Sequence, residues 1–463
     1  MTKPESGFME KYTSVEDIIR HLSDLGHQKV KVAVTDIDGV LRGKYIHIDK
    51  FISASEKGFG FCNVIFGWDS SDQCYMNSKY TGWHTGYPDA EARIDLKTLR
   101  FIPWDDKTPF FLADFQNAKG EPLEICPRQI LKKVIGLMQS MGFSAKVGVE
   151  FEWFNFKETP ESVREKNYKK LVPLSPGMFG YSVLRSSLNH EFFKNLMESM
   201  HSFNVPLEGL HTETGPGVLE GAIMNCDPLT AADRGTLFKT GVKEIGSKLG
   251  ILASFMPRWN TDLAGCGGHL HMSLLDDKGA SVFADTTARH KMSALFQSFL
   301  AGQIQYIPEL LALFAPTVNS FKRLVEGYWA PTRATWGLDN RTCAFRVINS
   351  HASATRVEVR VGGSDINPYL AIAAALGAGL MGVKKQLRLD QAPIVGNGYQ
   401  DSKAAPFARN LLGAAEGLRK SEIACELFGE NFVEHFANTR TWEWDLSQRA
   451  VNDWELQRYL EII

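Results

Sequence analysis

The sequence lacks the features that mark membrane, nucleic-acid-binding and secreted proteins. One segment, Asn367 to Val383, is apolar, but it is shorter than the roughly 18 residues that a membrane span needs, so we expect a buried helix and no membrane anchor. The formal net charge is −2, which argues against a nucleic-acid-binding surface or a polybasic membrane patch. The first residues also lack the apolar stretch of a signal peptide.

Cysteine is sparse and irregularly placed. The seven cysteines are an odd number and none lies in a CxxC pair, which argues against a disulfide framework. We therefore expect a protein of the reducing cytoplasm. Hydrophobic residues make up 44% and charged residues 22% of the chain, and both values are ordinary for a globular protein.

Two parts of the chain differ in character. Residues 29–48 alternate with the period of a strand around a tight turn at Asp38, and a loop-rich stretch follows them. A helical pattern then begins at Pro127, a residue that suits the first position of a helix. We place a domain boundary near residue 117, which gives an N-terminal domain of residues 1–117 and a second domain of residues 118–463.

Three segments place charged side chains two residues apart, between apolar ones. They contain Glu150 and Glu152 in GVEFEWF, His269 and His271 in GGHLHMSL, and Arg356, Glu358 and Arg360 in ATRVEVRV. Residues two apart share a face of a β-strand, so each segment predicts a strand with one polar and one apolar face. Such alternation arises on the solvated face of an antiparallel sheet or along a polar cavity. The polar faces carry Glu, His and Arg only, which favours the cavity.

Carboxylates and histidines of this kind suit a metal site. Glu213 and Glu220 flank a Gly-Pro-Gly turn in HTETGPGVLEG, a turn that folds both carboxylates toward one point. Carboxylates with a histidine are typical ligands of a hard divalent ion such as Mg²⁺ or Mn²⁺. Arginines beside such an ion are typical of phosphoryl transfer, because the charge on phosphate oxygens needs cations. The pattern therefore favours a site for a metal and a phosphate group.

The order of several motifs resembles the glutamine synthetase superfamily. The motifs are GVEFEWF, HTETGPGVLEG, GCGGHLHMSL, NSFKRLVEGYWAP, GLDNRTCAFRV and RVEVRVGGSDINPYLA, and the resemblance covers nearly the whole chain. It implies an α+β fold, with a small N-terminal β-grasp domain followed by a catalytic domain that has a curved antiparallel sheet and flanking helices. It also implies a homo-oligomer, a double ring with active sites between adjacent subunits. The substrates would be ATP, glutamate and an amine, with Mg²⁺ or Mn²⁺ as the metal.

The resemblance carries a role to each matching position. For one metal site the matching residues are Glu152, Glu213 and Glu220, and for the other they are Glu150, His269 and Glu358. For glutamate they are Gly265, Arg323 and Arg360, the last also beside the transferring phosphoryl group. For the ATP phosphates and the transition state they are Arg341, Arg346 and Arg356. His271 and Ser273 match residues beside ATP, and Asp36 matches an aspartate that a neighbouring subunit supplies to attract ammonium.

The chain departs from the glutamine synthetase pattern at positions that serve substrate binding. Trp329 stands where those enzymes have a loop glutamate that binds ammonium and takes its proton. Ala264 replaces an asparagine that contacts substrate, Arg258 lies in a changed nucleotide-binding string, and Val218 replaces a frequent glutamine. The string GNGYQDS around Tyr399 matches the family's regulatory tyrosine motif poorly, so control by adenylylation is not expected.

These departures favour a γ-glutamylamide synthetase, which joins glutamate to an organic amine. Two alternatives remain open: an authentic glutamine synthetase that uses ammonia, and an inactive relative that serves as a scaffold or regulator. The complete set of metal ligands argues against the inactive relative. Trp329 could also be a packed anchor of its loop without any substrate contact. The sequence does not identify the amine, and alkylamines, polyamines, aromatic amines and ethanolamine-like amines all stay open.

Overall fold

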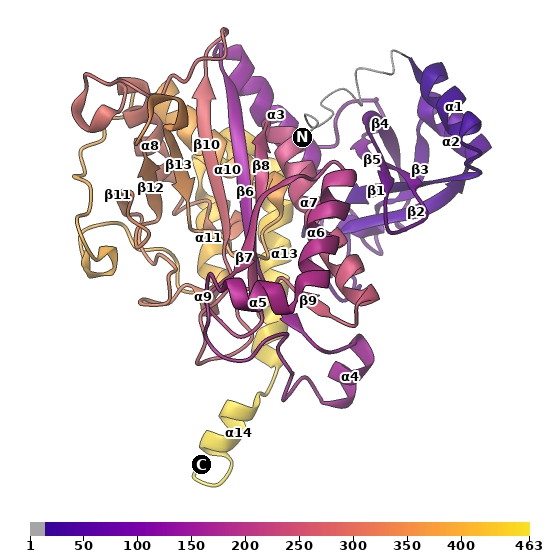
Figure 1. Ribbon diagram of the computed structural model, residues 1–463. Helices are drawn as coiled ribbons and strands as arrows, with labels where there is room; N and C mark the ends of the chain where they lie inside the picture. Colours follow the sequence, from indigo (N-terminus) through magenta and orange to yellow (C-terminus); the bar gives the residue numbers. More distant parts are fainter. Residues whose placement is uncertain (1–13) are drawn as a thin grey trace.

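The computed structural model describes residues 14–463, which build two separate β-sheets with helices packed around them (Figure 1). The first sheet has five strands in the order β2-β1-β5-β4-β3. They are β1 (Lys29–Thr35), β2 (Leu41–His47), β3 (Phe59–Cys62), β4 (Asp89–Ile102) and β5 (Thr108–Gln116). Strands β1 and β5 are parallel, and helix α2 (Ile48–Lys57) contacts β1, β2 and β4. This is the β-grasp domain that the resemblance implies.

The predicted alternation at the start of this domain is confirmed as a hairpin. Strands β1 and β2 pair antiparallel from Lys29 opposite His47 to Thr35 opposite Leu41. Gly39 lies in the turn with a φ of 81°, a left-handed value that glycine adopts without strain. Helix α1 (Val15–Asp24) precedes the hairpin, and the hydroxyl of Ser14 caps it by accepting the N–H of Asp17.

The second sheet has eight strands and forms the centre of the larger part. Its order is β11-β12-β13-β10-β6-β8-β7, with β9 paired to β6. The strands are β6 (Ser144–Phe156), β7 (Leu207–Thr212), β8 (Val218–Cys226), β9 (Leu252–Ser254), β10 (Gly268–Leu275), β11 (Trp336–Leu338), β12 (Phe345–Ile348) and β13 (Arg356–Val359). All pairs are antiparallel except β11 with β12. The expected curved antiparallel sheet is therefore present with one parallel pair at its edge.

Helices pack against this sheet and against one another. The longer ones are α3 (Pro127–Ser140), α6 (His190–Ser202), α7 (Pro228–Lys248), α8 (Ala294–Tyr306), α10 (Pro368–Lys384), α11 (Leu411–Lys420) and α13 (Glu430–Arg449). The shorter ones are α4 (Pro160–Glu165), α5 (Val183–Leu188), α9 (Ser320–Arg323), α12 (Glu422–Phe428) and α14 (Asp453–Tyr459). Figure 1 shows α14 extending away from the body at the end of the chain.

Helix α10 is the apolar segment, and it is buried as expected. Its first residue is Pro368, and the side chain of Asn367 caps it by accepting the N–H of Tyr369. Glycines let α8 approach closely, since a Cβ on Gly382 would lie 2.1 Å from the carbonyl oxygen of Ser298. Among the helices of residues 14–463, none has the length and apolar character to cross a membrane.

The alternating strands have one face toward the helices. Val149, Phe151 and Trp153 of β6 are buried in the main core, while Glu150 and Glu152 point the other way and are half-buried. Neighbouring polar side chains of β10 and β13 are buried outright. The polar face is thus a sheltered cavity, as the residue types suggested, and the solvated-face alternative is wrong.

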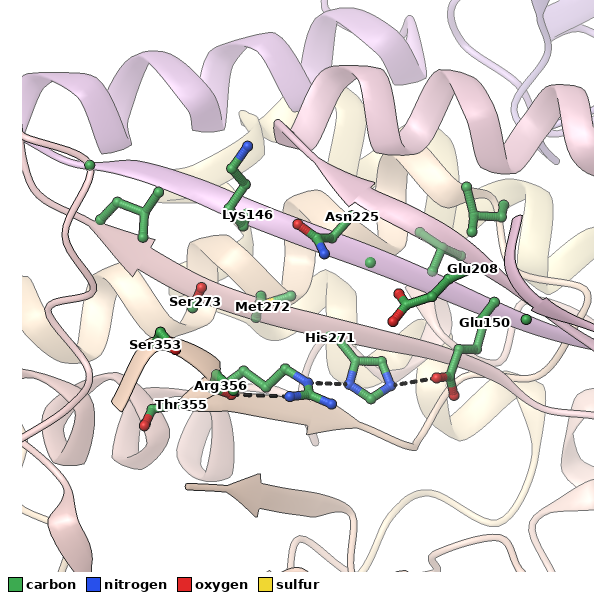
Figure 2. Close-up of a pocket in the computed structure, with 18 residues that line it drawn as sticks. Lys146, Glu150, Glu208, Asn225, His271, Met272, Ser273, Ser353, Thr355 and Arg356 are labelled. Carbon is green, nitrogen blue, oxygen red and sulfur yellow. Dashed lines mark hydrogen bonds and ion pairs between the residues drawn. The ribbon is translucent and has the colours of Figure 1, made fainter. Parts of the chain in front are cut away.

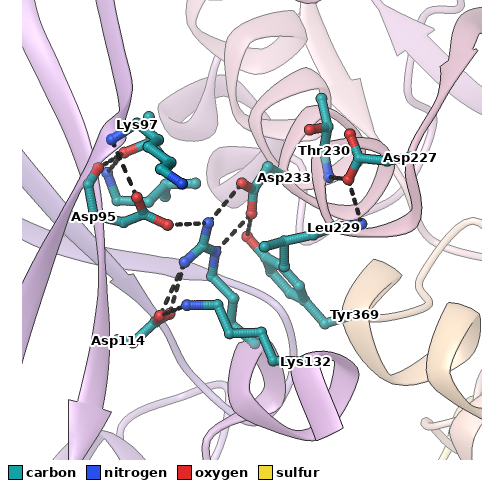
Figure 3. A network of polar contacts seen from close by, with 12 residues as sticks. Asp95, Lys97, Asp114, Lys132, Asp227, Leu229, Thr230, Asp233 and Tyr369 are labelled. Carbon is teal, nitrogen blue, oxygen red and sulfur yellow. Dashed lines mark hydrogen bonds and ion pairs between the residues drawn. The ribbon is translucent and has the colours of Figure 1, made fainter. Parts of the chain in front are cut away.

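A buried arginine of α3 ties the first sheet to helix α7 of the larger part. Arg128 donates to Asp233 of α7 at 2.8 and 2.9 Å, to Asp114 of β5 at 3.0 Å, and to Asp95 of β4 at 2.9 Å. Figure 3 shows these three aspartates converging, with the hydroxyl of Tyr369 also donating to Asp233. Burial opposes the charge of Arg128, but the aspartates outweigh it and hold the pKa of the guanidinium well above its usual value.

We expect Arg128→Met to destabilise the protein by about 3–5 kcal/mol, because it leaves buried carboxylates without their cation. The measurement is the midpoint of urea unfolding, followed by circular dichroism. Arg20→Met is the matched control, since Arg20 pairs with Asp17 at the surface and its side chain is 72% exposed. An Arg128→Met midpoint equal to that of Arg20→Met would show that the network does not hold the first sheet to α7.

Candidate active site

Three adjacent strands bring the first set of predicted metal ligands together. His269 of β10 lies directly opposite Glu150 of β6 in the strand register, and β13 supplies Glu358 on the other side. One ligand atom from each of the three lies within 4.8 Å of the other two. His269 Nδ1 is 3.7 Å from a Glu150 oxygen and 3.6 Å from a Glu358 oxygen. His269 Nε2 is buried and has no hydrogen-bond partner among the described residues.

Both carboxylates of this cluster are held ionised. Burial raises the pKa of Glu150, but His269 and His271 outweigh burial and hold it well below its usual range. Burial also raises the pKa of Glu358, which is only 1% exposed. Arg360 and the two histidines outweigh burial and lower this pKa to about 2. Two ionised carboxylates with His269 Nδ1 beside them form a donor set that suits a divalent cation.

The second cluster differs from the predicted one by a histidine. Its members, with ligand atoms within 4.8 Å of one another, are His211, Glu213 and Glu220. His211 lies 3.7 Å from a Glu213 oxygen and 3.8 Å from a Glu220 oxygen. Glu152 faces Glu220 across the β6–β8 pair, but one of its oxygens accepts the N–H of Gly267 at 2.6 Å. The predicted residues are thus neighbours, and His211 is the member that the sequence analysis missed.

A signal for His211 was present in the sequence. His211 and Glu213 are two residues apart in HTE, the same spacing that marked Glu150 and Glu152. Strand β7 ends at Thr212, so His211 is the second-to-last residue of the strand and Glu213 is the first residue after it. The ring of Tyr181 stacks on the imidazole, with centroids 4.5 Å apart.

The carboxylates of the second cluster repel one another. Burial and the charges of Glu152, Glu150, Glu213 and Glu358 raise the pKa of Glu220 to about 9. One oxygen of Glu213 is also buried without a partner. Crowded carboxylates with open oxygens fit a divalent ion, because a cation removes the repulsion and fills the vacant acceptor sites.

The predicted arginines line the same polar face. Arg346 donates to Glu358 at 2.8 Å, and Arg360 pairs with the other Glu358 oxygen. Arg360 also donates to the carbonyl of Arg341 at 3.1 Å. Arg323, which is buried, donates to the carbonyl of Val361 at 3.1 Å. These contacts fix positive charges beside Glu358 of the first cluster, and such charges suit phosphate or carboxylate groups.

A cavity of about 570 Å³ opens beside the first cluster (Figure 2). Its walls include His271, Ser273 and Arg356, the residues expected near ATP. Figure 2 shows Arg356 donating to His271 Nδ1, at 3.1 Å, while the other ring nitrogen lies 3.1 Å from Glu150. Glu208 and Asn225 also line this cavity, and the sequence offered no signal for either, because each stands alone in its segment.

Two glycines leave space between the first cluster and Arg323 that side chains would fill. A Cβ on Gly265 would lie 2.4 Å from the carbonyl oxygen of Pro257 and 2.9 Å from the Arg323 side chain. A Cβ on Gly267 would lie 2.5 Å from His269 Nε2 and 2.9 Å from Arg323 Nη2. The space between the first cluster and Arg323 therefore depends on backbone without side chains, which suits the role expected of Gly265.

The loop that carries Trp329 lies at the surface. The Trp329 side chain is 54% exposed, and its φ of 62° is left-handed, which is uncommon for a residue other than glycine. Glu326, three residues earlier, is also exposed and accepts the hydroxyl of Thr332 at 3.4 Å. Val218, by contrast, is buried with Phe154 in a small apolar cluster, so that departure serves packing.

Asp36 lies apart from both clusters within one chain. It is 4% exposed and accepts the N–H groups of Asp38 and Val40 at 3.0 and 2.9 Å, and Arg42 Nε at 2.9 Å. Burial and the charge of Asp38 raise its pKa to about 7. In a single chain Asp36 therefore shapes the hairpin turn, and its role in a neighbouring subunit's site stays a prediction.

Comparisons with known proteins agree with this geometry. Residues 124–459 match the family described as glutamine synthetase, catalytic domain. The "Type-1 glutamine synthetase 2" of Dictyostelium discoideum is 53% identical over 458 residues, covering 98% of this chain and 88% of the relative. The "Glutamate--isopropylamine ligase" of a Pseudomonas species is 38% identical over 437 residues, covering 94% and 95%. A solved GmaS/ADP complex superposes with a TM-score of 0.83 at 26% identity, covering 96% of this chain and 99% of that one.

The fold and the clusters of carboxylates, histidines and arginines are those of a ligase of the glutamine synthetase type. The chain belongs to the glutamine synthetase family. Enzymes of this family use ATP, divalent metal ions, glutamate and either ammonia or an amine.

Proposed function

We propose that the protein joins the side-chain carboxylate of glutamate to an organic amine, with ATP as the phosphoryl donor and Mg²⁺ or Mn²⁺ as the metal. The two clusters, Glu150–His269–Glu358 and His211–Glu213–Glu220 with the adjacent Glu152, would hold the cations. Bound there, a divalent ion would neutralise charge on the phosphate oxygens. The cavity beside His271 and Ser273 would take the nucleotide.

The chemistry proceeds in two steps that these residues can support. A glutamate carboxylate oxygen attacks the γ-phosphorus, the bond to the ADP oxygen breaks, and a γ-glutamyl phosphate forms. The amine nitrogen then attacks the acyl carbon, phosphate leaves and the nitrogen loses a proton. Arg323 would hold the glutamate α-carboxylate, while Arg341, Arg346, Arg356 and Arg360 would stabilise the phosphoryl oxygens. Water must stay out while the acyl phosphate exists, because hydrolysis would discard it.

One observation supports an organic amine over ammonia: the loop beside Arg323 presents Trp329, a half-exposed indole, where the family's glutamine synthetases carry an acid. An indole cannot take a proton from ammonium, but it offers apolar surface to a substituent on the acceptor. Its exposure also speaks against a role as a packed loop anchor.

The proposal is tested by measuring phosphate release with glutamate and ATP across a panel of acceptors. The panel contains ammonia, methylamine, isopropylamine, ethanolamine, putrescine and aniline. We expect at least one organic amine to exceed ammonia in kcat/KM by about tenfold, corresponding to about 1.4 kcal/mol of transition-state binding. Ammonia as the best acceptor in the panel would overturn the proposal.

The competing function is glutamine synthetase proper, and the 53% identity to a protein with that name favours it. Synthesis of glutamine would need another group to bind ammonium in place of the loop acid. An inactive scaffold is disfavoured, because both clusters and the arginines around them are intact in this chain.

We also propose that the enzyme is a cytoplasmic homo-oligomer, a double ring with active sites shared between subunits. Helix α14 extends from the body with exposed apolar side chains, among them Trp454 and Leu460, and α5 exposes Val183 and Leu188. Exposed apolar surface on this scale is typical of a contact with another chain. Asp36 would then act on the site of the neighbouring subunit.

A further inference from the structure

Arg258 connects two segments that the sequence analysis treated separately. Its guanidinium donates to the carbonyls of Asn260 at 3.2 Å, Thr261 at 2.6 Å and Lys322 at 2.7 Å. Its backbone N–H donates to the side chain of Asn319 at 2.9 Å. Three of these four hydrogen bonds come from the guanidinium, so the protein backbone holds it in place.

The same guanidinium covers an aromatic ring of the Trp329 loop. Arg258 Cζ lies 4.5 Å from the centroid of the Tyr328 ring, within the range of a cation–π contact. Arg258 is absent from the walls of the nucleotide cavity. The part of its segment in nucleotide binding therefore stays a prediction, while its contact with the Trp329 loop is observed.

The loop needs such support, because its backbone is strained. Gly327 and Trp329 both have left-handed φ values, 83° and 62°, and such a value costs a residue with a side chain of this size free energy. Tyr399 lies against the same stretch of backbone. Its hydroxyl is buried and has no hydrogen-bond partner among the described residues. Burial raises the pKa of Tyr399, while the charges of Arg360 and Arg323 and the nearby backbone of Trp329 lower it by less.

Tyr399 is itself anchored to the segment that carries Arg341. The side chain of Asn397 accepts the Tyr399 N–H at 3.0 Å, and Thr342 accepts the N–H of Gly398 at 2.8 Å. Arg258 thus contacts the Trp329 loop at Tyr328, and Tyr399 lies beside it at Trp329. Hydrogen bonds to the rest of the protein hold Arg258 and the backbone of Tyr399 in place.

We propose that Arg258 is a positioning residue for acceptor binding, which holds the Trp329 loop in the conformation that receives the amine. This inference rests on the proposed function for the place of the acceptor beside the Trp329 loop, and it applies whichever amine is the acceptor. Arg258 also adjoins the glutamate end, since the carbonyl of its neighbour Pro257 accepts the N–H of Cys266 at 2.7 Å, next to Gly265. That contact is made by backbone atoms, so Arg258→Ala removes the side-chain contacts toward the loop and leaves it in place.

The test is steady-state kinetics of the full-length Arg258→Ala enzyme with its best acceptor, ammonia included. We expect the KM for the acceptor to rise about tenfold, while the KM values for ATP and glutamate change less than about twofold. Glutamate-dependent ATP hydrolysis without acceptor should increase, because the loop no longer excludes water. Chymotrypsin should also cleave the loop at Tyr328 or Trp329 faster than in wild type.

Matched variants separate this role from a loss of folding. Tyr328→Leu removes the ring but leaves the hydrogen bonds of Arg258, and it should raise the acceptor KM similarly, whereas Tyr328→Phe keeps the ring and should restore it. Lys385→Ala, which removes a cation 5.7 Å from the Tyr306 ring behind the sheet, is the control. An unchanged acceptor KM in Tyr328→Leu, or an equal rise in the KM for ATP in Arg258→Ala, would overturn the inference. These measurements use the best acceptor of the enzyme, whether it is ammonia or an organic amine. A preference for ammonia would therefore contradict the proposed function but not the role of Arg258.

Discussion

Glu358→Ala is expected to lower glutamate-dependent phosphate release on the order of 100-fold or more. Glu358 is 1% exposed, lies 3.6 Å from His269 and pairs with Arg346 and Arg360. Its loss removes an anionic group from the first cluster and leaves two arginines without their shared partner. Both changes weaken the stabilisation of charge on the transferring phosphoryl group.

Thermal unfolding separates the cation site from catalysis. Mn²⁺ should raise the Tm of the wild-type protein, with a shift that grows with the logarithm of the ratio of Mn²⁺ concentration to Kd, and Glu358→Gln, which keeps the shape, should reduce this increase. Glu434→Gln is the control, because Glu434 pairs with Lys79 at the surface and belongs to neither cluster. Near-normal phosphate release in Glu358→Ala, with an undiminished Mn²⁺ effect in Glu358→Gln, would remove Glu358 from the cation site.

Trp329→Glu is expected to move the preference between acceptors toward ammonia, on the order of 10–100-fold in the ratio of kcat/KM values. The indole can bury apolar surface of an amine substituent, a contribution of about 1–2 kcal/mol for a small alkyl or aryl group. A glutamate loses that contact, but attracts ammonium and can accept its proton.

The kinetic comparison includes a variant that tests the apolar contact alone. Trp329→Gln lacks both the indole and the base, so it should lose activity with the organic amine without gaining activity with ammonia. If Trp329→Glu and wild type have the same ratio of kcat/KM values, Trp329 does not select the acceptor.

The strand pattern predicted much of the site because period-two alternation fixes which side chains share a face. Glu150 and His269 were predicted from this pattern alone, and they are directly opposed in the register. Pro127 and Asn367 likewise mark the helix starts that local chemistry dictates. The pattern could not reveal the Arg128 network, since Asp95, Asp114 and Asp233 are brought together only by tertiary packing.

Other features depend on contacts that no local signal encodes. The guanidinium of Arg258 contacts the ring of Tyr328 from a distant segment of the chain. The residues around each of them in the sequence carry no pattern that predicts this contact. The assignment of Glu152 to the second cluster came from the resemblance and stays a prediction, and the structure adds His211 beside Glu213 and Glu220. The role of Asp36 requires a second chain, so one chain's sequence and structure leave it a prediction.

A direct competition between acceptors tests the central claim most simply. Wild-type enzyme is given ATP, Mg²⁺, glutamate, and equal concentrations of ammonium and of the best organic amine, and the products are separated by mass. The account predicts that the γ-glutamylamide of the organic amine exceeds glutamine by about tenfold. Glutamine as the main product would contradict it and identify the protein as a glutamine synthetase in function as well as in family.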